Sequence, residues 1–199
     1  MTNTKPNIIL IVSDQHRGDW MSCTGDKHVK TPYLDQLAAR GVRFDDMLCN
    51  YPLCGPSRMS FLTGRHPFRN DITINEHSLS SDTPTIAHAL GRAGYESVLA
   101  GRMHFNGADQ RHGYEKRLVG DVCRCYAGGP ITPVQGELDG CMGNLKRATE
   151  KAGPGDNFIY EYDHDVTSAA ERFIDERDDE RPLFMTVGWY LPHHPYNAP

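Results

Sequence analysis

The sequence lacks a long apolar segment. The longest apolar run near its start covers residues 8–12 of 199, far short of the roughly 18–20 residues that a membrane-spanning helix requires. We also expect no secretory leader, because the polar residues 1–6 run directly into that apolar stretch. We therefore expect a protein that does not enter a membrane and that is cytoplasmic.

A cysteine pattern typical of a disulfide framework and an excess of basic residues are missing too. The six cysteines lack the spacing of a disulfide framework. Cys123, Cys125, Cys141 and the nearby His112 are a weak metal pattern, because they lack the two-residue spacer of zinc sites. The formal net charge of −5 argues against nucleic acid as a partner. Any anionic ligand must therefore be bound by local arginines and histidines.

What the sequence does contain is an alternation of short apolar runs and capped helical patterns. Strand-like runs occupy residues 7–12, 42–47, 96–100 and 182–190, and helical patterns occupy 31–41, 83–94 and 165–174. We expect the first strand to be buried on both faces and the helix at 31–41 to pack on the sheet. This order predicts an α/β fold whose mixed, largely parallel central sheet is flanked by helices. Residues 120–160 have little periodicity and are expected to form an irregular segment over the site.

The segment from Leu53 to Arg65 reads as a loop that leads into a short helix. Pro56 suits the first helical turn, and Gly64 is a plausible stop. Cys54 would then lie where the helix begins, where free N–H groups and the helix dipole favour an anion. Arg58, one turn further, would direct a guanidinium to the same place. The alternative is a buried structural cysteine.

Polar residues also follow the predicted strands. Asp14 comes after the first strand, where it is either a ligand for a hard cation or a cap for the next turn. Arg102 and His104 follow the strand at 96–100, a pairing suited to gripping an oxyanion and moving a proton. A core histidine is the alternative for His104. Asp109 and His112 either border the pocket or form a hydrogen-bonded loop pair.

Three motifs carry a family resemblance. Cys-x-Pro-Ser-Arg followed by Leu-Thr-Gly-Arg begins at Cys54, Pro-Asn-Ile-x-x-Ile-x-x-Asp opens the chain, and Pro-His-x-Pro-Tyr lies at 192–196. Together they resemble the type I sulfatases, which are formylglycine-dependent members of the alkaline-phosphatase-like superfamily. The run Met-His-Phe-x-Gly-x-Asp-Gln from Met103 is similar to choline-sulfatase-like bacterial members.

The resemblance assigns roles to five residues around the sulfate ester. It implies that Cys54 is oxidised to formylglycine, whose hydrated aldehyde is the nucleophile, and that Arg58 holds this hydrate. His104 and Arg102 would contact the ester near its leaving oxygen. Arg102 departs from the family pattern, in which lysine is commoner at this position. His193 would reach the sulfate.

The resemblance also implies a metal site and a truncated chain. Asp14, Gln15 and Cys54 are the expected ligands of a divalent cation, which we expect to be Ca²⁺, with Mg²⁺ or Mn²⁺ as alternatives. The family supplies further ligands later in its sequence. We therefore expect residues 1–199 to be the amino-terminal part of a single catalytic domain that is incomplete at its C-terminus.

The activity implied is that of a sulfuric ester hydrolase that cleaves a small-molecule sulfate monoester to alcohol and sulfate. A formylglycine-generating enzyme is expected as a transient partner, and a homo-oligomer is left open. One alternative is a phosphonate monoester or phosphodiester hydrolase of the same superfamily. The other is a fragment that binds anions without catalysis.

Overall fold

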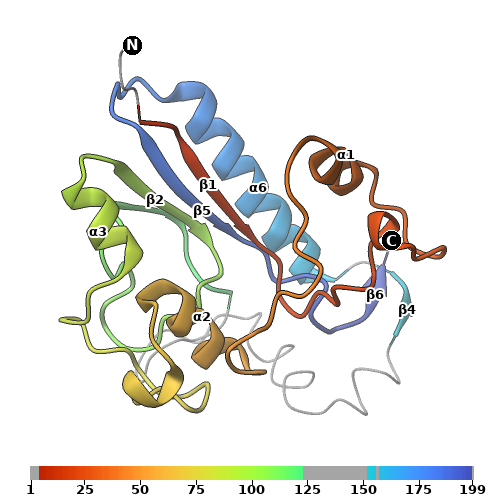
Figure 1. Cartoon of the computed structure of the whole chain (residues 1–199), viewed down its shortest axis with the longest axis horizontal. Coiled ribbons are helices and arrows are strands. Elements are labelled where there is room, and N and C mark those ends of the chain that lie inside the picture. Colours follow the sequence, from red (N-terminus) through yellow and green to blue (C-terminus); the bar gives the residue numbers. More distant parts are fainter. Residues whose placement is uncertain (1–4, 123–151, 156, 199) are drawn as a thin grey trace.

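The protein is built on a parallel sheet. A computed structural model describes residues 5–122, 152–155 and 157–198. Its four-stranded sheet has the order β1–β5–β2–β3, and all neighbouring strands are parallel (Figure 1). The strands are β1 (Ile8–Val12), β2 (Glu96–Gly101), β3 (Lys116–Val119) and β5 (Leu183–Gly188). The predicted α/β class is confirmed.

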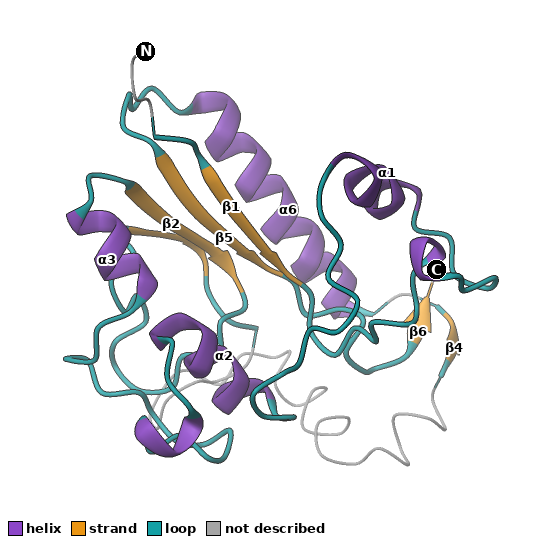
Figure 2. Cartoon of the chain, viewed as in Figure 1, coloured by secondary structure: helices purple, strands orange, loops and turns teal. Residues whose placement is uncertain are grey.

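Helices cover the two faces of this sheet. Helix α6 (Phe158–Glu176) runs along one face, and α2 (Cys54–Thr63) and α3 (Ile86–Arg92) lie on the other side (Figure 2). Strands β2 and β5 are buried throughout, and their side chains alternate between two clusters. Val98 packs in the cluster under α6, and its neighbour Leu99 packs in the cluster with α2 and α3. The two central strands are therefore fixed by apolar burial on both faces.

Three predictions about the first fifty residues are wrong. Strand β1 lies at the edge of the described sheet and is covered on one face only: Leu10 packs against the cluster with α2 and α3, whereas Ile9 and Ile11 are exposed. Helix α1 (Pro32–Arg40) has no buried residue and lies against a 3₁₀ helix at Ser22–Thr24 instead of the sheet (Figure 1). Residues 42–47 form no strand, and Phe44 is exposed. The apolar and polar residues of this segment alternate as in a strand, but the segment pairs with no neighbouring strand in the described part of the chain.

The remaining elements are short. A second 3₁₀ helix covers Pro67–Arg69, and β4 (Gly153–Pro154) pairs in parallel with β6 (Asn197–Ala198). The predicted irregular segment lies largely outside the described residues, as do all of Cys123, Cys125 and Cys141. In the described part of the chain, no helix has the length and apolar character needed to cross a membrane.

The carboxyl ends of β1, β5 and β2 lie level with one another. Gly188 of β5 is in register with Val12 of β1 on one side and with Gly101 of β2 on the other. A Cβ atom on Gly188 would meet the Arg102 carbonyl oxygen at 2.0 Å, and one on Gly101 would meet the Gly188 carbonyl oxygen at 2.3 Å. Glycine at both positions therefore lets the chain after β2 cross close to β5. The residues that follow these strands emerge at one edge of the sheet.

Candidate active site

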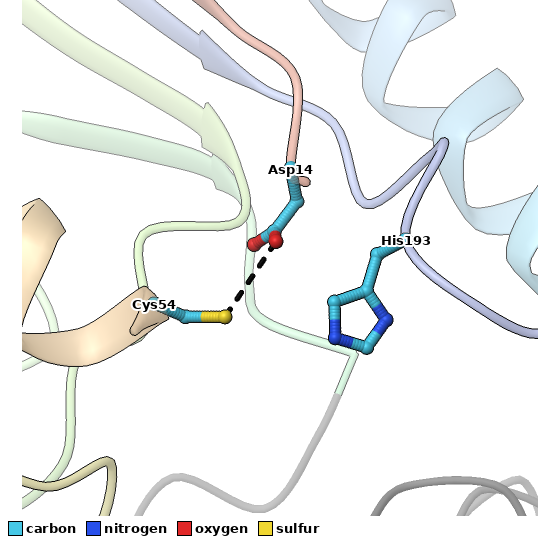
Figure 3. A group of neighbouring side chains, drawn as sticks. All are labelled: Asp14, Cys54 and His193. Carbon is cyan, nitrogen blue, oxygen red and sulfur yellow. Dashed lines mark hydrogen bonds between the residues drawn. The ribbon is translucent and has the colours of Figure 1, made fainter. Parts of the chain in front are cut away.

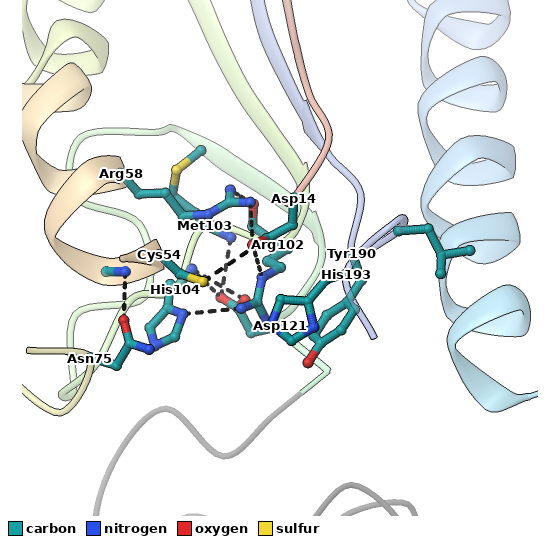
Figure 4. A network of polar contacts seen from close by, with 12 residues as sticks. Asp14, Cys54, Arg58, Asn75, Arg102, Met103, His104, Asp121, Tyr190 and His193 are labelled. Atoms are coloured by element: carbon teal, nitrogen blue, oxygen red, sulfur yellow. Dashed lines mark hydrogen bonds and ion pairs between the residues drawn. The ribbon is translucent and has the colours of Figure 1, made fainter. Parts of the chain in front are cut away.

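Asp14 lies at the centre of this edge. It follows β1, it is 6% exposed, and its Oδ2 accepts hydrogen bonds from Arg102 Nε at 2.8 Å and Arg58 Nη2 at 3.0 Å (Figure 4). Burial alone would raise the pKa of this carboxyl group. The two guanidiniums outweigh that effect and lower the pKa to about 2. Asp14 is therefore a carboxylate shared by two buried cations.

Cys54 is the first residue of α2 and points toward Asp14. Its Sγ donates to Asp14 Oδ1 at 3.5 Å. The next backbone N–H, of Gly55, donates to Oδ1 of Asn75 at 2.8 Å, so a side chain from a distant loop caps the helix. Burial and the nearby Asp14 raise the pKa of the Cys54 thiol. The residue is consequently a neutral thiol, not the thiolate that a cysteine nucleophile needs.

Arg102 is held on several sides. It is 1% exposed, its guanidinium lies 4.2 Å from the centre of the Tyr190 ring, and its Nη2 donates to Nδ1 of His104 at 3.3 Å. Arg58 is tied to the same segment, because its Nη1 donates to the Arg102 carbonyl oxygen at 2.8 Å. The two arginines therefore form one rigid unit around Asp14.

His104 has a left-handed backbone conformation, with φ of 64°. Such a conformation costs about 1–2 kcal/mol for a residue other than glycine. Its ring is half-buried, and burial and the charge of Arg102 lower the pKa to about 4. Because Arg102 donates to Nδ1, the neutral ring carries its proton on Nε2. His104 can therefore donate a hydrogen bond from Nε2 at neutral pH.

His193 reaches the site from the loop after β5. Its Nδ1 donates to the His194 carbonyl oxygen at 2.8 Å, and its ring packs edge-on against Tyr190 with centroids 4.7 Å apart. Asp163 on α6 holds this loop, since its carboxylate accepts from the N–H groups of Tyr190 and Leu191 at 2.7 and 2.9 Å. Burial lowers the pKa of His193 to about 4.

Asp14, Cys54 and His193 together resemble part of a metal site. Each offers one ligand atom, and these atoms lie within 4.8 Å of one another (Figure 3). A carboxylate suits Ca²⁺, but a thiol and an imidazole do not, and Ca²⁺ takes about six to eight oxygen ligands. An oxygen in place of the Cys54 sulfur would improve the fit. Asp14 therefore fits Ca²⁺ as one ligand, residue 54 would fit only with an oxygen in place of its sulfur, and the His193 imidazole does not fit.

Gln15 is placed differently from the other predicted ligands. Its side chain is exposed, and its Nε2 donates to the Tyr196 hydroxyl at 3.4 Å. It does border the same cavity of about 670 Å³ as Asp14 and Cys54. Its role as a ligand stays a prediction.

The structure brings most of the predicted site residues together at one edge of the sheet: Asp14, Cys54, Arg58, Arg102, His104 and His193. Asp109 and His112 form the loop pair, with Asp109 accepting the His112 N–H at 3.0 Å, and neither lines the cavity.

Four supporting residues carried no motif in the sequence: Asn75, Asp121, Asp163 and Tyr190. Each contacts the site across a long stretch of chain or through the backbone of a neighbour. Tyr190 ends the run predicted as a strand at 182–190, whereas Asp121 follows a strand that the sequence did not predict.

The chain belongs to the sulfatase family, whose model matches residues 6–199. Members of this family generally use a metal and formylglycine. The chain is 38% identical to choline-sulfatase of Rhizobium meliloti, over 100% of this chain and 40% of that protein. It is 30% identical to N-acetylglucosamine-6-O-sulfatase of Bacteroides thetaiotaomicron, over 95% of this chain and 31% of that protein. The chain thus spans less than half the length of these relatives.

Solved structures share the fold. The structure of BT4656 in complex with its substrate D-glucosamine-2-N,6-O-disulfate superimposes with a TM-score of 0.71 and 26% identity, over 96% of this chain and 35% of that one. A phosphonate monoester hydrolase of Agrobacterium radiobacter gives a TM-score of 0.69 at 24% identity, over 98% of this chain and 42% of that one. The second likeness concerns the fold alone.

Proposed function

We propose that this chain is part of a sulfuric ester hydrolase that cleaves a sulfate monoester to alcohol and sulfate. The observation that carries the proposal is the placement of Cys54. It begins a helix, points at Asp14 and lies beside two buried arginines. The chain spans 40% of its choline-sulfatase relative, so the activity proposed is that of the whole protein. Choline sulfate is the first ester to test, because of this relative.

Residue 54 is proposed to act as formylglycine, because its own thiol is neutral and so a poor nucleophile. When present, the hydrated aldehyde supplies an oxygen nucleophile that the coded side chains lack. Arg58 and Arg102 are two fixed positive charges beside Asp14, and their proposed role is to stabilise the negative charge that develops on the sulfate. His104 donates from Nε2 to the leaving oxygen, and His193 contacts the sulfate.

The metal is proposed to be Ca²⁺, held by Asp14 and residue 54, with Gln15 as a further candidate. A divalent cation would polarise the sulfate and favour an ionised nucleophile. The remaining ligands must come from water, substrate or residues beyond those described here. Chelation followed by addition of Ca²⁺, Mg²⁺ or Mn²⁺ would identify the ion through the recovery of activity.

The modification of Cys54 is the decisive test. We expect a formylglycine-generating enzyme to lower the mass of the Cys54 peptide by about 18 Da, the difference between thiol and aldehyde. The experiment is a mass measurement of the whole protein and its tryptic peptides after co-expression with that enzyme. Cys54→Ala is the control, and its peptide should not change. An unmodified thiol in the natural sequence would refute the proposal and favour the anion-binding alternative.

Substrate choice tests the hydrolase alternative. Two buried guanidiniums can stabilise any tetrahedral anion, so the geometry also accommodates a phosphonate monoester. Rates on matched aryl sulfate and aryl phosphonate esters separate the two. We expect the higher kcat/KM on the sulfate, and the reverse order would replace the proposed function. The cytoplasmic location and the oligomeric state stay predictions.

A further inference from the structure

A buried carboxylate outside the predicted set holds the backbone of His104. Asp121 follows β3, and its side chain is 2% exposed. Its Oδ1 and Oδ2 lie 3.2 and 3.1 Å from the His104 backbone nitrogen, and Oδ2 also accepts from the Met103 N–H at 3.4 Å (Figure 4). Both oxygens of one carboxylate are thus directed at the turn in which His104 has its left-handed conformation.

The charge of Asp121 is fixed by Arg117. Arg117 Nη2 donates to Asp121 Oδ2 at 2.7 Å, and both side chains are buried. Burial alone would raise the pKa of Asp121, but Arg117 and Arg102 outweigh it and lower the pKa. Asp121 is therefore an anion at neutral pH and accepts hydrogen bonds from two N–H groups more strongly than a neutral group would.

Arg117 also stabilises the rest of the loop after β2 through hydrogen bonds. Arg117 Nη1 donates to the Gln110 carbonyl and Oε1 atoms at 2.8 and 2.7 Å. Gln110 Nε2 in turn donates to the carbonyl oxygens of Phe105 and Gly107, both at 2.8 Å. The segment that carries Arg102 and His104 is consequently held by hydrogen bonds with Arg117, Gln110 and Asp121.

We propose that Asp121 is a positioning residue, which holds His104 in its left-handed conformation so that the imidazole faces the reacting ester. This inference rests on the proposed function. Without the carboxylate, the turn would relax toward ordinary backbone angles and move the ring. A displacement of about 1 Å in such a group costs on the order of 100-fold in rate.

The leaving group provides a readout that a merely structural role would not move. A hydrogen bond from His104 matters most when much negative charge develops on the leaving oxygen. In the whole, formylglycine-bearing enzyme, we expect Asp121→Asn to lower kcat/KM for an alkyl sulfate by about 100-fold and for 4-nitrophenyl sulfate by less than about 5-fold. Adding Asp121→Asn to His104→Ala should change neither rate by more than about 3-fold.

Glu96→Gln is the matched control. Glu96 is also a buried carboxylate bound to an arginine, Arg177, but it lies at the opposite end of β2. We expect this variant to leave the ratio of the two rates unchanged. If Asp121→Asn lowers both rates equally, or remains fully effective without the His104 ring, the positioning role is refuted. If Asp121→Asn does not fold, Arg117→Lys replaces it in this test. It keeps a cation beside Asp121 but loses the planar guanidinium. The rate on the alkyl sulfate should again fall more than the rate on 4-nitrophenyl sulfate, but by a smaller factor than expected for Asp121→Asn.

Amide hydrogen exchange separates this inference from the proposed function. We expect the peptide containing Met103 and His104 to exchange at least about 10-fold faster in Asp121→Asn than in the natural protein or in Glu96→Gln. A natural enzyme that hydrolyses neither sulfate ester would refute the proposed function, and the exchange rates would still decide whether Asp121 holds this turn. Unchanged exchange in Asp121→Asn would overturn the inference.

Discussion

Replacing Arg102 with lysine tests how the site is built, because it keeps the positive charge but removes the planar guanidinium. The guanidinium simultaneously contacts Asp14 at 2.8 Å, His104 at 3.3 Å and the Tyr190 ring at 4.2 Å. A lysine ammonium is a single point charge on a flexible stem. At this buried position it can keep the contact with Asp14, but it cannot reach the other two groups from the same place.

The expected loss follows from the two contacts that disappear. A hydrogen bond from a charged donor contributes about 1.5–3 kcal/mol, and a desolvated cation–π contact contributes about 2 kcal/mol. Part of this is recovered as the ammonium relaxes toward Asp14. We therefore expect Arg102→Lys to lower the free energy of unfolding by about 3 kcal/mol.

Urea unfolding of the whole protein at pH 7 measures this change. Arg181→Lys is the matched control, because Arg181 is 44% exposed and its ion pairs with Glu115 and Asp179 lie at the surface. The same substitution there should cost less than about 0.5 kcal/mol. If Arg102→Lys is no more destabilising than Arg181→Lys, then the planar fork of Arg102 does not hold the site together and the reasoning fails.

Three further predictions concern other parts of the molecule. His104 should titrate with a pKa of about 4 in the free protein, because burial and Arg102 oppose its charged form. NMR titration of the ring measures this pKa, and a value above about 6 would contradict the prediction. Gly188→Ala should cost more than about 4 kcal/mol in unfolding free energy, since the new Cβ would lie 2.0 Å from the Arg102 carbonyl oxygen, whereas Gly91→Ala in α3 meets nothing within 4 Å and should stabilise the protein slightly. Glu96→Gln should cost about 2 kcal/mol at pH 7. Hydrogen bonds from Lys116 and Arg177 outweigh burial and lower the pKa of Glu96 in the folded protein. The stability that the Glu96 carboxylate contributes is therefore complete above its unfolded-state pKa and is lost as the pH falls through its folded-state pKa. A urea-unfolding difference between natural and variant protein that does not shrink on acidification would exclude this cause.

Local patterns predicted the elements that carry the site. The strands at β1, β2 and β5 were each recognised from a short apolar run, and α2 was recognised from Pro56 near its start and Gly64 at its end. Gly64 indeed has a left-handed φ of 66°. The carboxyl ends of parallel strands share an edge, which is why the polar residues noted after these strands lie near one another.

Contacts across the sequence could not be predicted in the same way. Arg58 and Arg102 are 44 and 88 residues from Asp14, and nothing local indicates that both guanidiniums bind one carboxylate oxygen. The pattern of α1 predicted a helix, but amphipathicity does not say what the apolar side packs against. Strand β3 was missed because it has only four residues and begins with two cations. β3 is a strand because it pairs with β2, and its own sequence gives no strand pattern.

The charges of the site and of the chain have opposite signs, and this difference limits how an anionic ester can be recognised. Two guanidiniums face the single carboxylate of Asp14, and the pKa values of about 4 leave His104 and His193 neutral at pH 7, so this cluster carries net positive charge. The chain as a whole carries a formal charge of −5. At physiological salt the surrounding field is screened beyond about 8 Å. Attraction therefore acts only once the ester is inside the cavity, where burial makes the guanidiniums effective. Selection of the ester then depends on the rigidity of Arg58 and Arg102, which is why the groups that hold them and His104 in place matter as much as the charges themselves.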